Sequence, residues 1–123
     1  MSDGMPDKDF PVRAAEALER IGGDKAFLFE LIEIYCVEFG PKTKNLEKAI
    51  KANDFVAIRD IAHNLKGSSG SLGLGFLQIA ALNLEKAARK EEAQMAWRAL
   101  VELKREYRRL ETYLSREEWK SSL

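Results

Sequence analysis

The sequence predicts an all-α protein, an antiparallel four-helix bundle with a short additional helix at its N-terminal end. Apolar residues recur at steps of three and four along four long segments, which is the spacing of helices in a bundle. Short clusters of Gly, Pro, Asn or Asp separate these segments, and no internal repeat is present. With 123 residues, the chain suits one such domain.

A glycine pair ends the first predicted helix. This short helix is expected over residues 11–21, and Pro11 fits its opening turn because the amide hydrogen that proline lacks is not needed there. Gly22 and Gly23 then stop the helix. We expect residues 1–10 to form a flexible N-terminal segment.

A long amphipathic segment follows over residues 25–52, and Asp24 is well suited to be its N-cap. Gly40 and Pro41 interrupt the segment, and proline inside a helix removes one hydrogen bond of the helical ladder. We therefore expect either one kinked helix or two helices that meet near Pro41.

Two further breaks delimit the remaining three helices. Asp54 is a plausible N-cap for the next helix, and Gly73 and Gly75 bracket the turn after it. The apolar stripes of the three helices contain Phe55, Ile58, Ala62, Leu65, Ser69 and Leu72; then Leu77, Ala80, Ala81, Leu84, Ala87 and Ala88; then Ala96, Leu100, Leu103, Tyr107, Leu110 and Leu114. The bundle should therefore cover residues 11–114, before a polar C-terminal tail over residues 115–123.

The composition excludes several classes of function. Twenty basic and twenty acidic side chains cancel, so no overall field favours nucleic acid or an anionic membrane. No apolar run is long enough to span a membrane, and the first residues do not resemble a signal peptide. One His and one Cys are too few for a zinc site within the chain. We expect a cytoplasmic protein, without a metal of its own, that is monomeric because no stripe demands a dimer.

Residues 62–73 depart from what a purely structural helix favours. Glycine within a helix costs about 1 kcal/mol relative to alanine, yet Gly67 and Gly70 lie in or near the last turns of the predicted helix. The glycines either leave space for a binding partner or allow another helix of the bundle to pack closely, and the residues alone do not decide between these two roles.

The single histidine should lie on the outer face of its helix. At 100° per residue, Ala62 and Leu65 point to the core and His63 lies about 100° further round, with Lys66 and Gly67 one turn along from it. Neutral imidazole can attack phosphorus with a ring nitrogen. An ammonium about 5 Å from a phosphorylated imidazole would contribute roughly 3 kcal/mol at an effective dielectric constant near 20, and less if it is well solvated.

The run AHNLKGSSGSLGL, in which His63 is followed after two residues by Lys66 and Gly67, resembles the signature of histidine-phosphotransfer (HPt) domains. The Gly-Gly-Asp start of the long helix and the Leu84-Glu85 pair also resemble that family, and the resemblance covers residues 12–113. It implies an HPt four-helix bundle that relays a phosphoryl group between the aspartates of receiver domains in a two-component phosphorelay.

The resemblance also implies roles for individual residues. His63 would be phosphorylated, Lys66 would stabilise the phosphoryl oxygens, and Gly67 would give the receiver room. The partners would be receiver domains of a hybrid sensor histidine kinase and of a downstream regulator. A receiver would supply Mg²⁺, while this chain would need no cofactor and would be a carrier rather than an enzyme. Helix geometry places the docking surface over Val56, Arg59, Asp60, Asn64, Gly67 and Gly70.

Two other functions compete with the carrier. An adaptor bundle would bind a receiver without being phosphorylated, but such a protein has no need for both His63 and Lys66. An enzyme using His63 as a general base would need a cleft and a second catalytic group, and the sequence identifies neither. The Met start and the compact length favour a free-standing protein over a piece of a larger one.

Overall fold

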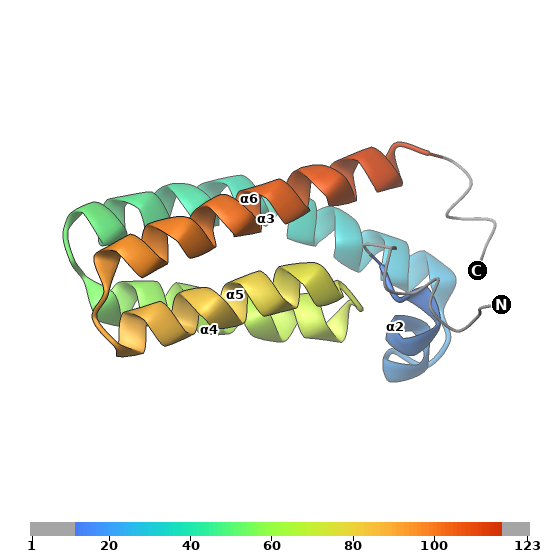
Figure 1. Cartoon of the computed structure of the whole chain (residues 1–123). Helices are drawn as coiled ribbons and strands as arrows, with labels where there is room; N and C mark the ends of the chain where they lie inside the picture. The colour runs from blue at the N-terminus through green and yellow to red at the C-terminus, as the bar shows by residue number, and fades with distance from the viewer. Residues whose placement is uncertain (1–11, 117–123) are drawn as a thin grey trace, which may run out of the picture.

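The structure is a computed structural model that describes residues 12–116. Within this range the chain forms five helices and no strand: α2 (Ala14–Arg20), α3 (Lys25–Lys51), α4 (Phe55–Ser71), α5 (Gly75–Arg89) and α6 (Ala93–Leu114). Figure 1 shows α3 and α6 above α4 and α5, with the short α2 at one end. The predicted fold class, a helical bundle with a short extra helix at its N-terminal end, is confirmed.

The boundaries follow the predicted signals with two differences. The first helix begins at Ala14, later than the predicted residue 11, and Pro11 lies outside the described residues. The long helix runs without a break through Pro41, so the alternative of two separate helices is wrong. Next to the proline, the Thr43 hydroxyl donates a hydrogen bond of 2.9 Å to the carbonyl of Gly40.

The predicted apolar stripes meet in one core. Their largest fully buried members are Leu28, Leu46, Ile50, Ile58, Leu65, Leu77, Leu84, Leu100, Leu103 and Leu110. Alanines of α5 (Ala80, Ala81, Ala87 and Ala88) are also buried and let neighbouring helices approach closely. Tyr107, whose ring stacks on Phe39 with centroids 3.9 Å apart, packs at the edge of this core, where the sequence predicts it.

The turn between α4 and α5 is fixed by the segment before α2. The backbone amide of Arg13 donates a hydrogen bond of 2.7 Å to the carbonyl of Gly73. Gly73 adopts a φ of +72°, and a Cβ atom built there would lie 2.6 Å from the Arg13 carbonyl oxygen. Only glycine can adopt this φ angle while the Arg13 backbone lies so close. This contact holds the C-terminal end of α4 in place.

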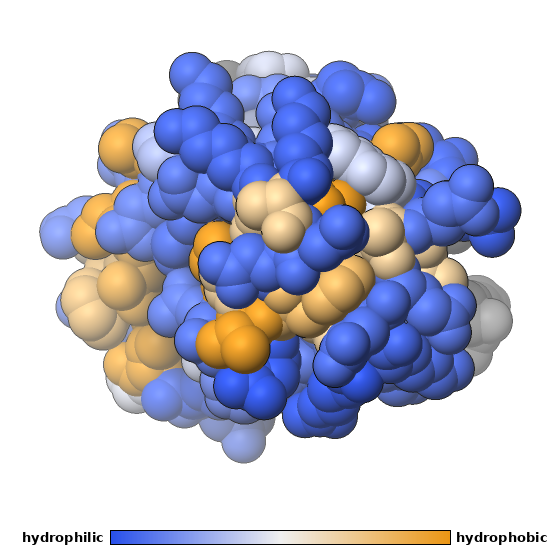
Figure 2. All heavy atoms as spheres, turned by 90° about the vertical axis from the view of Figure 1, so that its left-hand side faces the viewer, coloured by the Kyte–Doolittle hydropathy of each residue, from blue (hydrophilic) through white to orange (hydrophobic). Residues whose placement is uncertain are grey.

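The opposite end of the bundle carries the turns between α3 and α4 and between α5 and α6. Figure 2 views this end, where hydrophilic side chains cover most of the surface and apolar groups show between them. No helix between residues 12 and 116 has the length and apolar character needed to cross a membrane.

Asp54 caps the helix that carries His63, because its carboxylate accepts a hydrogen bond of 3.1 Å from the Ala57 amide. We expect Asp54→Ala to lower the free energy of unfolding by about 1 kcal/mol, since the first turn of α4 then loses that acceptor. Urea denaturation followed by circular dichroism measures the change. Asp54→Asn, which keeps a side-chain acceptor, should retain most of the stability, and equal losses in the two variants would contradict the capping role.

Candidate functional site

His63 lies on the outer face of α4, as predicted. Its neighbours Ala62 and Leu65 are buried in the core, whereas the imidazole side chain is 68% exposed. The ring leans toward α5, where its Nδ1 atom is 3.0 Å from Oε2 of Glu85. One ring nitrogen is therefore engaged with the protein while most of the ring faces solvent.

Glu85 is a buried carboxylate that holds three basic groups together. It is 1% exposed, and besides the His63 ring it contacts the Lys66 ammonium, 2.8 Å from Oε1, and the Arg89 guanidinium, 3.0 Å from Oε2. Oε1 makes no well-directed hydrogen bond, so charge attraction holds its contact with Lys66. The Lys66 ammonium lowers the pKa of the Glu85 carboxyl, against the opposing effect of burial, and the contacts with His63 and Arg89 lower it further.

The charge of Glu85 determines which imidazole nitrogen carries the proton. Because its pKa is lowered, the carboxylate is ionised at neutral pH and can only accept hydrogen bonds. Nδ1 of His63 must then donate, which places the proton of the neutral ring on Nδ1 and the free lone pair on Nε2. The arrangement therefore leaves Nε2 as the ring nitrogen with an available lone pair.

The two glycines of α4 lie in different surroundings. A Cβ atom on Gly67 would meet no atom within 4 Å, so the space beside His63 is open and no other helix uses it. A Cβ atom on Gly70 would lie 2.6 Å from the side-chain amide nitrogen of Gln78 on α5, and the Gly70 carbonyl accepts a hydrogen bond from Arg20. Gly67 thus faces open space, whereas Gly70 lies against the flexible end of the Gln78 side chain.

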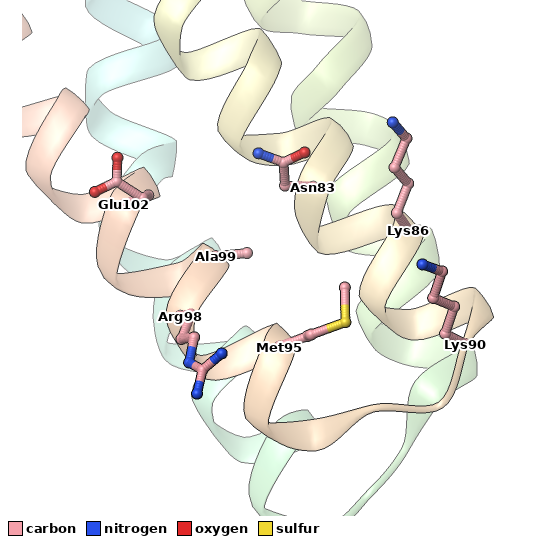
Figure 3. Close-up of a pocket in the computed structure, with 7 residues that line it drawn as sticks. All are labelled: Asn83, Lys86, Lys90, Met95, Arg98, Ala99 and Glu102. Atoms are coloured by element: carbon pink, nitrogen blue, oxygen red, sulfur yellow. The ribbon is translucent and has the colours of Figure 1, made fainter.

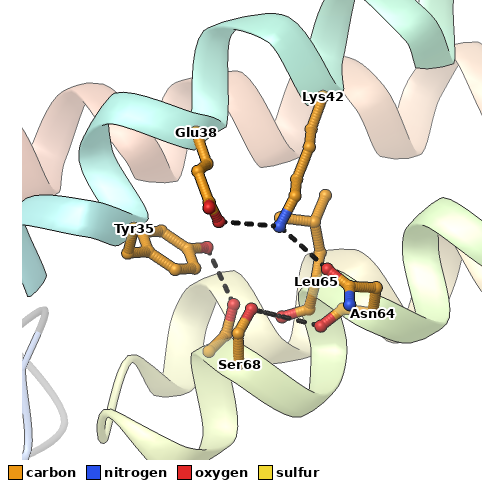
Figure 4. A network of polar contacts seen from close by, with 7 residues as sticks. Tyr35, Glu38, Lys42, Asn64, Leu65 and Ser68 are labelled. Atoms are coloured by element: carbon orange, nitrogen blue, oxygen red, sulfur yellow. Dashed lines mark hydrogen bonds and ion pairs between the residues drawn. The ribbon is translucent and has the colours of Figure 1, made fainter. Parts of the chain in front are cut away.

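A polar network joins α4 to α3 on the other side of His63 (Figure 4). Lys42 donates a hydrogen bond of 2.8 Å to the side-chain oxygen of Asn64 and forms an ion pair of 3.3 Å with Glu38. Deeper in the bundle, the hydroxyl groups of Tyr35 and Ser69 are hydrogen bonded at 2.8 Å. Burial raises the pKa of the Tyr35 hydroxyl, so this group remains neutral. The network fixes α4 against α3.

The other predicted docking residues are spread along α4 and are mostly exposed. Val56 is exposed, and Arg59 and Asp60 are exposed neighbours whose side chains approach to 3.6 Å. Asn64 and Gly67 are exposed as well, whereas Gly70 is partly covered. Their docking role stays a prediction.

Sequence reasoning missed the contact of Glu85 with His63 and the position of Arg89. The available signal was a charged residue on an apolar stripe: Glu85 lies four residues after Ala81 and three before Ala88, both of which are buried. A carboxylate at such a position needs basic partners. Lys66 was expected as a cation beside the imidazole, and its ammonium pairs with the same carboxylate that the His63 ring contacts.

A hollow of about 270 Å³ lies between α5 and α6 and is lined by basic residues, Lys86, Lys90 and Arg98, together with Asn83, Met95, Ala99 and Glu102. Figure 3 shows that Met95 reaches across toward α5, while the Lys86 and Arg98 side chains extend in different directions. The basic groups do not converge on one point, so this hollow is not built to hold a single anion.

The contacts of Glu85 with its basic partners make the stability of the fold depend on pH. The folded-state pKa of Glu85 is lowered, so its contribution to stability is complete above the unfolded-state pKa, near 4.3, and is lost as pH falls through the folded-state value. We expect Glu85→Gln to be about 1–3 kcal/mol less stable than the wild type at pH 7, because the amide leaves Lys66 without a counter-charge.

Urea denaturation of the two proteins from pH 7 to pH 3 measures this difference, which should shrink as the pH falls below about 4. All other carboxyl groups are common to both proteins and cancel in the comparison. A difference that stays constant over this range would show that the charge of Glu85 does not stabilise the fold.

The family model of the Hpt domain matches residues 30–115 of the chain. These residues include His63, Lys66, Gly67, Glu85 and Arg89. No curated protein and no solved structure matches the chain. Hpt domains are phosphoryl carriers that act with receiver domains in two-component phosphorelays. Because the match covers more than half of the sequence and the helical bundle agrees with it, the chain belongs to the Hpt domain family.

Proposed function

We propose that this protein relays a phosphoryl group between receiver-domain aspartates through Nε2 of His63. The observation that carries the proposal is the contact of His63 with Glu85: an exposed imidazole whose Nδ1–H is held by a buried carboxylate. Such a ring keeps its lone pair on the outer nitrogen, where a receiver aspartyl phosphate can approach.

The transfer needs no proton movement. The Nε2 lone pair attacks phosphorus, the P–O bond to the receiver aspartate breaks, and the aspartate leaves as a carboxylate. The imidazole keeps its Nδ1 proton and becomes positively charged, and Glu85 compensates this charge at 3.0 Å. In the onward step an aspartate of a second receiver attacks phosphorus, and the P–N bond breaks to release neutral imidazole.

Lys66 and Arg89 assist with the charge of the phosphoryl group. Both basic groups contact Glu85, which places them beside the imidazole ring. Each is partly exposed, so its contribution is screened by solvent and is an aid to transfer rather than its source. Phosphoryl transfer depends mainly on positioning and charge stabilisation, and the receiver would supply the Mg²⁺ ion and its acidic ligands.

The partners we propose are receiver domains of a hybrid sensor histidine kinase and of a downstream regulator. We also propose that this protein is monomeric and acts in the cytoplasm. Docking should be transient, because the carrier must release each partner. Val56 and Gly67 lie on the same face of α4 as His63, with Arg59, Asp60 and Asn64 beside them. We propose this face as the part of the interface nearest to the phosphoryl group.

His63→Gln tests the carrier role. The variant should fold like the wild type, because the exposed ring contributes little to the core, but it should accept no phosphoryl group from a phosphorylated receiver in the presence of Mg²⁺. Wild-type protein should gain one acid-labile, base-stable group per chain and should stay unlabelled when mixed with ATP and Mg²⁺ alone. Labelling of His63→Gln, or acid-stable label on a serine, would sink the proposal.

Gly67→Gln separates access from stability. The free energy of unfolding should stay unchanged or rise by up to about 1 kcal/mol, because a Cβ atom at this position meets nothing and glutamine favours helix. Transfer from a receiver should slow at least tenfold, since the new side chain occupies the space beside His63. Rapid-quench measurement of transfer with Gly67→Ala and Gly67→Gln should show a graded loss, and fast transfer in both would remove the steric role.

A further inference from the structure

The hollow between α5 and α6 has an apolar floor and a basic rim, and we call it the basic hollow. Met95 and Ala99 form the floor, where the short alanine side chain leaves space and Met95 reaches across toward α5 (Figure 3). Lys86, Lys90 and Arg98 form the rim, and all three are exposed. Methionine is flexible and polarisable, so a floor of this kind can adapt to a bound side chain.

The cations of the rim have no counter-charge. Lys86, Lys90 and Arg98 form no ion pair within residues 12–116. The one acidic residue that lines the hollow, Glu102, is already paired with Arg105. The hollow is therefore a local excess of positive charge on a protein whose total charge is zero.

Local helix effects do not account for this excess. Lys86 and Lys90, the C-cap of α5, lie four residues apart, a spacing at which like charges oppose helix formation. The dipole of α5 favours cations at its C-terminal end and offsets that cost. Arg98 gains nothing from such a dipole, because it lies in the second turn of α6. Glu91 and Glu92 follow in the turn between the helices but do not line the hollow.

The shape of the hollow indicates the chemistry of its partner. Its basic groups are spread along two helices, so they match several spaced carboxylates better than one anion. Its floor needs an apolar side chain to cover it. A peptide segment in which Asp or Glu flanks an apolar residue supplies both groups. Nucleic acid would supply the charge alone, and its phosphates would leave the floor uncovered.

A second copy of the chain fits the basic hollow poorly. A two-fold dimer would place the same surface on both sides of the interface. The cations of one copy would then face those of the other, and such like-charge contacts oppose association.

The basic hollow is separate from the site of His63. The groups that contact the Glu85 carboxylate come from His63, Lys66 and Arg89, and none of these residues lines the hollow. Lys86 follows Glu85 directly in the sequence, but it lines the space toward α6. A partner bound in the hollow would therefore leave the imidazole accessible.

We propose that the basic hollow binds a segment of a partner protein in which an apolar side chain is flanked by Asp or Glu. This partner is distinct from the receiver that meets His63 and can stay bound during transfer. The proposal does not depend on the phosphoryl relay, because it uses other residues and its tests measure binding alone.

Selection from a phage library of random peptides about 12 residues long tests the chemistry of the partner. Wild-type protein should enrich peptides in which an apolar residue is flanked by Asp or Glu. The most enriched peptide, synthesised with a fluorescent label, is then the probe for binding by fluorescence anisotropy. Raising NaCl from about 50 mM to about 500 mM should weaken its binding at least about fivefold, because exposed charges make the contacts. Absence of enrichment, or enriched peptides without an excess of acidic residues, would overturn the proposal.

Charge reversal tests the rim. The double variant Lys86→Glu and Lys90→Glu should raise the dissociation constant of the labelled peptide at least about tenfold. The matched control is Lys44→Glu and Lys48→Glu, which reverses two exposed lysines four residues apart on α3 and should stay within about twofold of the wild type. Thermal unfolding followed by circular dichroism verifies that both variants fold. Equal losses in the two variants, or unchanged binding in the first, would show that the hollow does not bind the peptide.

Met95→Gln tests the floor, because glutamine keeps the length and helix propensity of methionine but is polar. The dissociation constant should rise about fivefold as apolar contact is lost. Val101→Gln, on the same helix but outside the hollow, is the control and should bind like the wild type. Equal binding by the two variants would contradict an apolar contact at the floor.

Three measurements test the other possible occupants. A dimer in sedimentation velocity that the double variant of Lys86 and Lys90 dissociates would assign the hollow to a second copy. Carbodiimide cross-links within one chain, between these lysines and an aspartate of residues 1–11, would assign it to that segment. A labelled dT oligomer of about 12 nucleotides should bind at least about tenfold more weakly than the peptide. Tighter binding of the oligomer would assign the hollow to nucleic acid, and each of these three results would overturn the proposal.

Discussion

The buried carboxylate of Glu85 is the constraint on which the site depends. A charge taken out of water must be compensated by nearby groups, and here the compensation comes from both sides of the contact between α4 and α5: His63 and Lys66 from one helix, Arg89 from the other. A shift of α5 along α4 by one turn would move the carboxylate by about 5 Å and separate it from these groups. The interaction that prepares the imidazole therefore also sets the register of the two helices.

Most of the fold follows from the sequence because apolar spacing and helix-capping residues are local signals. Asp24 and Asp54 cap the helices that they were expected to cap, and Leu65, Leu84 and Leu100 are buried as their stripes predict. The outward direction of His63 follows from helix geometry alone. The contact with Glu85 does not, because it joins residues 22 positions apart and depends on how two helices lie against each other. The partial exposure of Leu31 escaped prediction for the same reason, since only the packed bundle shows that this residue lies at the edge of the core.

The two sides of α4 make different kinds of contact. On the side toward α5, buried charge fixes the ring and its proton. On the side toward α3, the links from Lys42 to Asn64 and from Tyr35 to Ser69 fix the helix, and apolar groups remain open to solvent. Substitutions in the outer residues of α3 therefore leave the contacts of Glu85 intact, because all of these contacts come from α4 and α5.

Pro41 changes the backbone hydrogen bonding on the outer face of α3. Proline has no amide hydrogen, so the carbonyl of Val37, four residues earlier, cannot receive the bond that the helical ladder would otherwise provide. Val37 is among the most exposed apolar residues of the described chain. The carbonyl that lacks its usual ladder bond thus belongs to an exposed apolar residue. This carbonyl is a backbone group, so substitutions of the surrounding side chains leave it in place as long as Pro41 is kept.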